Sequence, residues 1–367
     1  MKIINVVGAR PNLMKIAPLI AAYKKAERIE PLLVHTGQHY DELMSNLFFH
    51  QLGIHEPDVN LGVGSGTHAV QTAEIMKAFE PIVLEYKPDA VIVVGDVNST
   101  IACGLVAVKL GVKLIHVEAG LRSFDRSMPE EINRVLTDSI SDFLFCTEQS
   151  GVDNLIREGI SEDKIFLVGN VMIDTLLKNR VLAEKSNILT ELKINNVAYA
   201  VLTLHRPSNV DNPTVLSRLL DAFETIQNDI SIIFPVHPRT HEHIAEFSRR
   251  LRKLNNLKLI NPLGYLDFLK LISGARLVLT DSGNIQEETT ILKVPCLTLR
   301  ENTERPATVE AGSNIVAGTE PEQIIRCYQR IMKRNRQRIT TPHSGTAWPL
   351  KESSKSFCRS YSHHLQI

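Results

Sequence analysis

Residues 2–11 read KIINVVGARP, an apolar run rich in β-branched residues that ends at a glycine and passes into a proline-marked helix start. Proline suits the first turn of a helix, and a strand that leads directly into a helix begins a βαβ unit. Similar apolar runs recur through the first half of the chain, and they predict strands at 3–7, 31–35, 90–94, 113–117 and 143–146. Segments of helical period separate these strands, such as 15–25 and 100–110, so this half predicts a doubly wound parallel sheet.

The same alternation returns in the second half of the chain. It predicts strands at 198–204, 230–236, 257–260, 276–280 and 296–299, with helices at 212–227, 241–254, 265–272 and 285–292. A chain of 367 residues is long enough for two domains of roughly 150–200 residues each. We therefore expect an α/β fold with two Rossmann-like domains, 1–170 and 171–335, that face a cleft, followed by an atypical tail at 336–367.

Composition and charge exclude several classes of protein. Lys plus Arg and Asp plus Glu are both 41, so no net field favours nucleic acid. The five cysteines show no metal-ligand spacing, which predicts a reduced, cytoplasmic protein without structural metal. No apolar run approaches the ~20 residues of a membrane span, and the chain opens in a strand rather than a signal peptide. We expect a soluble protein that binds neither nucleic acid nor membrane.

Charged side chains follow the predicted strands of the first half. Arg10 and Lys15 come directly after the first strand and put two cations at a helix N-terminus, although a solvated turn would also explain them. Asp96 follows the strand at 90–94, where it is a candidate for a working carboxylate or a cap of the next helix. In open α/β sheets the ligand lies beyond the carboxyl ends of the strands, so these residues point to a phosphate-bearing substrate.

The richest stretch lies between Glu118, at a strand end, and the helix that follows it. Ser127 and Glu130 fit a capping box, which gives Glu130 a structural explanation and leaves Glu131 without one. Arg134 lies one turn after Glu131, where a solvated ion pair would also account for it. Glu118 and Glu131 are therefore two carboxylates able to converge for acid–base chemistry.

Two strand ends of the second half deliver histidines. His205 with Arg206 follows one strand, and His237 follows the next. A lone histidine is more often structural than catalytic, but two histidines at successive strand ends favour a functional site.

A third strand end of this half carries the pattern of a nucleotide site. Ser282 and Gly283 follow the strand at 276–280, and the glycine lets the backbone approach a phosphate at a helix N-terminus. Glu288, about one turn into that helix, is suited to ribose hydroxyls, and Arg305 adds a charge after the next strand.

Nine segments together resemble the non-hydrolysing UDP-N-acetylglucosamine 2-epimerases over about residues 1–335. In chain order they are GARPNLMKIAPLI, TGQHY, GDVNST, HVEAGLRS, MPEEINR, LHRPSN, PVHP, TDSGNIQEE and RENTERP. The resemblance implies a glycosyltransferase-B-like pair of Rossmann domains, no metal or other cofactor, and usually a homodimer. It also implies a role in polysaccharide biosynthesis, through interconversion of UDP-GlcNAc and UDP-ManNAc by elimination of UDP to 2-acetamidoglucal and re-addition.

The resemblance also implies roles for single residues. Those that match catalytic positions of the family are Asp96, Glu118, Glu131 and His205. Those that match substrate-binding positions are Arg10, Lys15, Arg134, Ser282, Glu288 and Arg305. We add Arg206, His237 and Gly283 to the substrate-binding set because of their places at strand ends. Which carboxylate takes the proton stays open.

Departures from the family pattern leave the substrate and its regulation open. Asp41 and Val70 stand where members regulated by a second UDP-GlcNAc carry other side chains. Four residues of the allosteric pattern remain, namely Gln38, His39, Arg206 and His237, so allostery stays open. The run HRPSN at 205–209 differs from the commoner form, so a UDP-2,3-diacetamido uronic acid is an alternative substrate. A UDP-sugar-dependent glycosyltransferase of the same architecture is a further alternative. Such an enzyme does not need the carboxylates of Asp96, Glu118 and Glu131 around the sugar.

The tail departs from the family as a whole element. Members end in a Leu-Trp-Asp-Gly-like motif and a helix, whereas residues 343–353 read HSGTAWPLKES. In another reading frame the codons of these residues can encode the expected motif, so we interpret the tail as frameshifted. The remaining residues, 353–367, lack an apolar face and are expected to pack poorly.

Overall fold

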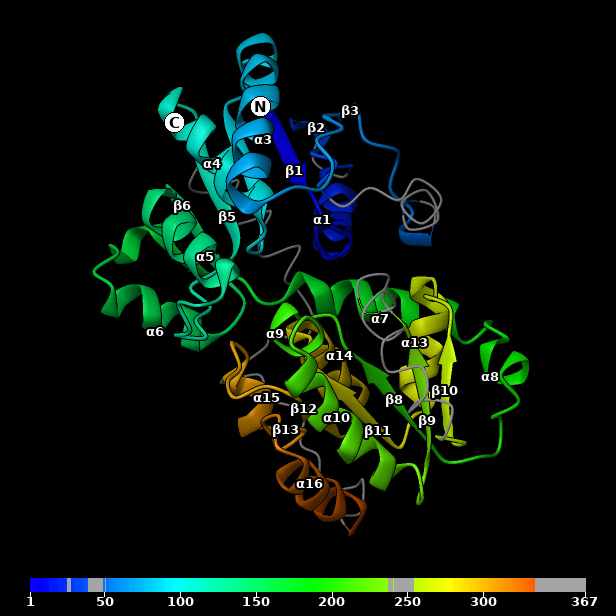
Figure 1. Cartoon of the computed structure of the whole chain (residues 1–367). Coiled ribbons are helices and arrows are strands. Elements are labelled where there is room, and N and C mark those ends of the chain that lie inside the picture. Colours follow the sequence, from blue (N-terminus) through cyan, green and yellow to red (C-terminus); the bar gives the residue numbers. More distant parts are fainter. Residues whose placement is uncertain (25–27, 39–48, 50, 237–239, 241–253, 334–367) are drawn as a thin grey trace. The chain divides into compact units, whose positions relative to one another are not determined.

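The computed structural model describes residues 1–24, 28–38, 49, 51–236, 240 and 254–333. His39, His237 and the tail at 336–367 lie outside this part, as does the predicted helix at 241–254 except for its last residue. The chain divides into two compact units, Met1–Leu177 and Lys178–Pro342. Figure 1 labels most of their helices and strands. The division comes within a helix, α7 (Val171–Ala183), rather than before it.

The start of α7 belongs to the first unit because its polar side chains reach into that unit. The hydroxyl of Thr175 donates a hydrogen bond of 2.6 Å to the carbonyl of Met14. The predicted boundary at 170/171 follows the turn-forming Gly169-Asn170, and such a turn reports a change of direction rather than which unit the next helix packs against.

The first unit is a seven-stranded sheet in the order β3-β2-β1-β4-β5-β6-β7, with every pair parallel. Its strands are β1 Lys2–Val7, β2 Glu30–His35, β3 Val59–Asn60, β4 Ala90–Val94, β5 Lys113–Ala119, β6 Phe143–Cys146 and β7 Ile165–Leu167. Its helices are α1 Arg10–Tyr23, α3 His68–Tyr86, α4 Asn98–Lys109, α5 Pro129–Ile140, α6 Gln149–Arg157, the first part of α7 and the 3-10 turn η1 Glu162–Lys164.

The second unit is a six-stranded parallel sheet in the order β10-β9-β8-β11-β12-β13. Its strands are β8 Tyr199–Thr203, β9 Ser231–Pro235, β10 Leu257–Ile260, β11 Leu277–Thr280, β12 Cys296–Thr298 and β13 Asn314–Val316. Its helices are α8 Ile188–Glu191, α9 Pro207–Val210, α10 Pro213–Ile226, α13 Tyr265–Gly274, α14 Gly283–Leu292, α15 Pro306–Glu310 and α16 Pro321–Lys333. The predicted fold class, two doubly wound parallel sheets, is confirmed.

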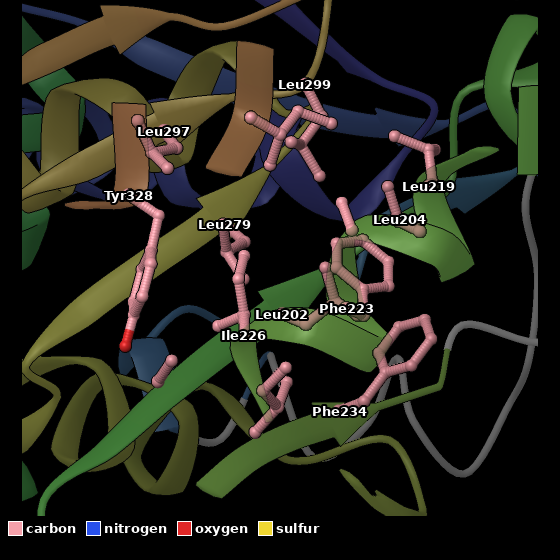
Figure 2. Packing of buried hydrophobic residues seen from close by; sticks show 14 of the residues in the cluster. Leu202, Leu204, Leu219, Phe223, Ile226, Phe234, Leu279, Leu297, Leu299 and Tyr328 are labelled. Carbon is pink, nitrogen blue, oxygen red and sulfur yellow. The ribbon is translucent and has the colours of Figure 1, made fainter. Parts of the chain in front are cut away.

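Each sheet is buried by apolar helix faces. In the second unit, α10 presents Leu219, Phe223 and Ile226 at helical spacing, and these side chains pack with Leu202 and Phe234 of the sheet (Figure 2). The first unit has a corresponding cluster in which β1 and β4 pack against α3 and α4. Burial on both faces explains why the central strands read as continuous apolar runs.

The topology of each sheet places its functional edge. Strand order reverses beside β1 and β4 in the first unit and beside β8 and β11 in the second. Ligands of doubly wound sheets bind beyond the carboxyl ends of the strands at such switch points. In the part of the chain that the structure describes, no helix is long and apolar enough to cross a bilayer.

Candidate functional site

Glu118 occupies a bulge at the carboxyl end of β5. The pairing of β5 with β6 shifts register between Val117 and Ala119, and Glu118 has a φ of 76°. This left-handed conformation costs a residue other than glycine roughly 1 kcal/mol or more. The strand continues past the predicted end at 117, and the bulge re-aims the glutamate side chain.

A buried ion pair joins the Glu118 carboxylate to the Lys15 ammonium of α1. Gly95, which follows β4, has a φ of 70°. A Cβ at this position would lie 3.0 Å from Lys15 Nζ and 3.4 Å from Glu118 Oε2. Glycine is therefore required here both by the left-handed backbone and by the space that the ion pair occupies. Lys15 after β1, Gly95 after β4 and Glu118 at the end of β5 thus lie side by side.

Glu131 holds the loop that precedes α5. Its carboxylate accepts hydrogen bonds from the Ser123 amide at 3.0 Å, the Ser123 hydroxyl at 3.0 Å and the Phe124 amide at 2.9 Å. The predicted capping box of Ser127 and Glu130 is wrong. The helix begins at Pro129, the residue before it makes no side-chain cap, and the Ser127 hydroxyl donates to Asp125 instead.

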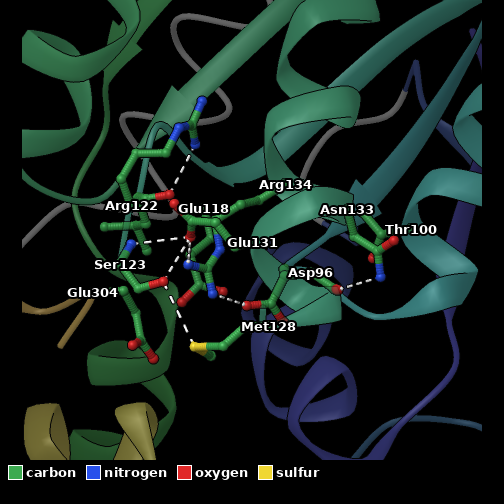
Figure 3. A network of polar contacts seen from close by, with 12 residues as sticks. Asp96, Thr100, Glu118, Arg122, Ser123, Met128, Glu131, Asn133, Arg134 and Glu304 are labelled. Carbon is green, nitrogen blue, oxygen red and sulfur yellow. Dashed lines mark hydrogen bonds and ion pairs between the residues drawn. The ribbon is translucent and has the colours of Figure 1, made fainter. Parts of the chain in front are cut away.

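Arg134 joins two of the predicted carboxylates. Its guanidinium forms a buried ion pair with Glu131 and lies 2.7 Å from Asp96 Oδ2. The Asp96 side chain is 32% exposed, whereas those of Glu118 and Glu131 are buried. Figure 3 shows this network around the first turn of α5. The structure thus brings Asp96, Glu131 and Arg134 together, and Glu118 with Lys15 extends from the neighbouring strand end.

In the second unit, Asp281 organises the segment that carries His205 and Arg206. It is fully buried after β11 and accepts hydrogen bonds from the amides of His205 at 3.0 Å and Arg206 at 2.9 Å. His205 Nδ1 lies 3.0 Å from Asp281 Oδ1, and the His205 side chain is 38% exposed. Burial alone would raise the pKa of Asp281, but His205 and the two amides lower it below the ordinary value. Sequence reasoning did not single out this aspartate.

The N-terminus of α14 meets a carboxylate of the chain itself. A Cβ on Gly283 would lie 2.2 Å from Glu304 Oε1. Glu304 Oε2 is 2.8 Å from Arg300 Nη2, and Glu304 Oε1 is 3.7 Å from Arg206 Nη2. Ser282, the residue before the helix, makes no side-chain cap. The glycine predicted to admit a phosphate therefore lies beside an anion that two arginines also contact.

Glu288 and Arg305 are both buried but have different partners. Burial raises the pKa of Glu288 to about 8, and a hydrogen bond with the Tyr265 side chain opposes part of that rise. Arg305 Nε lies 2.9 Å from Glu287 Oε1, so Glu287 sets the position of the arginine. A buried carboxyl with a pKa near neutrality can be protonated and donate a hydrogen bond to a sugar hydroxyl, or be ionised and accept one from it.

Gln38, the described member of the predicted allosteric pair, is buried beside the start of α4. Its side-chain oxygen accepts hydrogen bonds from the amide and the hydroxyl of Ser99, at 3.1 and 2.7 Å, and so satisfies the first turn of α4. The Arg10 side chain lies outside the described part. Within the described residues, no group of three or more His, Cys, Asp or Glu side chains is arranged to hold a metal ion.

The model of the UDP-N-acetylglucosamine 2-epimerase family matches residues 21–347. The chain belongs to this family. It is 47% identical over 343 residues to the UDP-N-acetylglucosamine 2-epimerase of Methanococcus maripaludis, covering 91% of this chain and 93% of that protein. It is 40% identical over 328 residues to the UDP-2,3-diacetamido-2,3-dideoxy-D-glucuronate 2-epimerase of Pseudomonas aeruginosa, covering 89% and 90%.

A solved structure of the same family matches the whole chain. The crystal structure of Methanocaldococcus jannaschii UDP-GlcNAc 2-epimerase in complex with UDP-GlcNAc and UDP gives a TM-score of 0.91 at 44% identity. The match covers 99% of this chain and 100% of the other. This structure and the present chain therefore share their full architecture.

Proposed function

We propose that this member of the family interconverts UDP-GlcNAc and UDP-ManNAc. The observation that carries the proposal is the cluster in the first unit, in which Asp96, Glu118 and Glu131 are held by Lys15 and Arg134 at the carboxyl ends of β4 and β5 and the start of α5. Family membership and the 47% identical epimerase support the substrate class.

The reaction that suits this cluster is an anti-elimination followed by re-addition. The C2 hydrogen of the sugar is barely acidic because no carbonyl adjoins it, so cleavage of the C1–O bond must develop positive charge on the ring. Carboxylates fixed in place stabilise that charge without reorganising. One proton leaves C2 as UDP departs from C1, and the 2-acetamidoglucal then takes a proton on the other face of C2 and UDP at C1.

We assign the nucleotide to residues of the second unit. The N-terminus of α14, with Ser282 and Gly283, offers amides and a dipole that favour a diphosphate, and Arg206 adds positive charge. Glu288 and Arg305 are assigned to the uridine part of the substrate, and His205, fixed by Asp281, to the reacting end. Arg10 and His237 remain proposed ligands whose side chains lie outside the described part.

A related UDP-sugar is the second candidate substrate. The relative that acts on UDP-2,3-diacetamido-2,3-dideoxy-D-glucuronate is 40% identical over 89% of this chain. Parallel assays with that sugar nucleotide and with UDP-GlcNAc rank the two by kcat/KM. A higher value for the uronate would replace our assignment of the substrate and leave the chemistry unchanged.

Incubation with UDP-GlcNAc in deuterated water tests the reaction. We expect deuterium at C2 of both UDP-GlcNAc and UDP-ManNAc, because the proton at C2 is exchanged whenever the intermediate is reprotonated. Free ManNAc with UDP would instead indicate a hydrolysing enzyme. Transfer of the sugar to an added acceptor without exchange at C2 would indicate a glycosyltransferase.

We also propose that the protein is a cytoplasmic homodimer, as the resemblance to the family implies. The described cysteines are all free and buried, in keeping with a reducing compartment. Light scattering coupled to size-exclusion chromatography measures the assembly, and a mass of one chain at micromolar concentration would contradict the dimer.

A further inference from the structure

A buried aspartate of α5, Asp138, contacts the chain on both sides of Glu118. Before the bulge, His116 Nδ1 lies 2.6 Å from Asp138 Oδ1. After the bulge, the amide of Gly120 donates to Asp138 Oδ2 at 3.0 Å, and Arg122 Nη1 lies 2.7 Å from the same oxygen. One carboxylate therefore fixes the chain before and after the glutamate.

This attachment coincides with the irregularity that presents Glu118. Strand β5 pairs with β4 up to Val117 and resumes pairing with β6 at Ala119. Gly120 has a φ of 80°, and a Cβ there would lie 2.2 Å from the carbonyl oxygen of Gly151. A left-handed glutamate persists only where the surroundings over-determine its backbone, and Asp138 supplies contacts of that kind.

The charges around Asp138 are arranged to keep it an ionised acceptor. Burial alone would raise its pKa, but His116 and Arg122 lower the pKa below the ordinary value. The rest of the Arg122 guanidinium pairs with Glu158, with hydrogen bonds of 2.8 and 2.7 Å. A buried network whose members are all paired is rigid, whereas an incomplete one is costly.

The network also holds Gly95, which lies beside the Lys15–Glu118 ion pair. His116 Nε2 lies 2.8 Å from the carbonyl oxygen of Gly95, the residue whose Cα faces this ion pair. Because the Gly95 carbonyl can only accept, His116 Nε2 donates to it, while Nδ1 faces the Asp138 carboxylate. Through His116, Asp138 is therefore connected both to β5, which carries Glu118, and to Gly95, which lies beside the Lys15–Glu118 ion pair.

We propose that Asp138 is a positioning residue for Glu118. This proposal rests on the proposed function, in which Glu118 acts on the sugar. Catalytic groups must be held within about 0.5 Å of the productive geometry, and a displacement of about 1 Å can cost on the order of 10²-fold in rate. Asp138 itself is buried and contacts His116, Gly120 and Arg122, so we assign it no direct part in the chemistry.

The first test replaces Asp138 by Asn, which keeps the shape and removes the charge. We expect kcat to fall about tenfold or more, with KM and the UDP dissociation constant changed by no more than about twofold. Rates are expressed per folded molecule, with the folded fraction of each variant taken from its circular dichroism and thermal unfolding. A merely structural role would reduce the number of folded molecules and leave the rate of each unchanged.

Asp142→Asn is the matched control. Asp142 also binds the backbone of β5, because its Oδ2 accepts from the Leu114 amide at 3.0 Å, while its Oδ1 lies 2.8 Å from Lys113 Nζ. It does so at the other end of the strand from Glu118. If Asp138→Asn and Asp142→Asn have the same kcat per folded molecule, the proposal is overturned.

Two substitutions of His116 keep the proposal testable if Asp138→Asn does not fold. In His116→Asn, the amide nitrogen takes the place of Nδ1 and keeps a donor toward Asp138. In His116→Gln, the amide nitrogen takes the place of Nε2 and keeps only the donor toward Gly95. We expect kcat to be at least about fivefold higher in His116→Asn than in His116→Gln. Equal values of kcat, or a higher value in His116→Gln, would contradict the proposal. A wild-type protein without epimerase activity would instead refute the proposed function.

Discussion

The proposed catalytic glutamates of the first unit and Glu288 of the second unit are held in opposite ways. In the first unit, Glu118 and Glu131 each form a buried ion pair, with Lys15 and Arg134 respectively. In the second unit, burial governs Glu288, and its pKa rises to about 8 although Tyr265 opposes the rise. The first arrangement compensates charge where positive charge is proposed to develop on a sugar. The second keeps a carboxyl neutral around pH 7, where it is proposed to bind a neutral part of the nucleotide.

The largest effect that distinguishes the two arrangements is expected from Glu118→Gln. Removing the carboxylate should lower kcat by ~10²-fold or more, because the charge is proposed to act in the transition state. The UDP dissociation constant should change little, since the nucleotide is assigned to the second unit. Steady-state kinetics and calorimetry measure the two quantities.

Glu130→Gln serves as the control for that experiment, because Glu130 lies at the start of α5 and is assigned no catalytic role. Loss of a buried partner leaves Lys15 uncompensated and can cost roughly 3–5 kcal/mol of stability. Rates are therefore taken well below the unfolding midpoint. If Glu118→Gln turns over like the control, the assignment of Glu118 to the chemistry is wrong.

The sequence predicted the sheets and their functional edges because buried parallel strands leave a strong local signal. The strand at 90–94 and the one that ends at Thr280 match β4 and β11, and polar residues follow both. The bulge at Glu118 was not predicted, because it depends on how β5 pairs with β6 rather than on the residue itself.

The structural aspartates were missed for a related reason. Asp138 lies in an amphipathic helix and Asp281 in a turn, and such residues are usually solvated or capping. Their roles depend on partners far away in sequence, such as His116 and His205. The short strands β3, β7 and β13 were also missed, since two or three residues carry too little pattern to separate from a loop.

A smaller effect, and of opposite sign, is expected from Glu304→Gln in the second unit. The Glu304 carboxylate lies beside Gly283 and contacts Arg206 and Arg300, the charges that suit a diphosphate. If the diphosphate binds there, it must displace this internal anion. Removing the charge should then tighten UDP binding by about tenfold, or roughly 1.4 kcal/mol.

Glu301→Gln is the matched control for Glu304, because it lies in the same loop and binds the amide of Thr319 at 3.0 Å instead. Calorimetric titration with UDP compares the two variants with the wild type. Weaker binding in Glu304→Gln than in the control would mean that Glu304 supports the arginines in the bound state rather than competing with the ligand.

A further effect concerns the pH dependence of stability in the second unit. The pKa of Glu288 is about 8 in the folded chain, above the ordinary value of 4.5. Between these two values the folded state holds a proton that the unfolded state has lost, so stability falls as pH rises and levels off above pH 8. The slope that this group contributes is at most about 1.4 kcal/mol per pH unit.

Glu288→Gln removes this contribution, so its unfolding midpoint should rise relative to the wild type as the pH increases from 6 to about 8, and the difference should then stay constant.

Tyr265→Phe removes the hydrogen bond that holds the pKa of Glu288 down, and it should move the levelling-off point to higher pH. Glu130→Gln, in the first unit, should keep the wild-type dependence. Thermal unfolding followed by circular dichroism at several pH values measures all three. If Glu288→Gln runs parallel to the wild type across this range, Glu288 is ionised in the folded chain, and its contrast with Glu118 and Glu131 disappears.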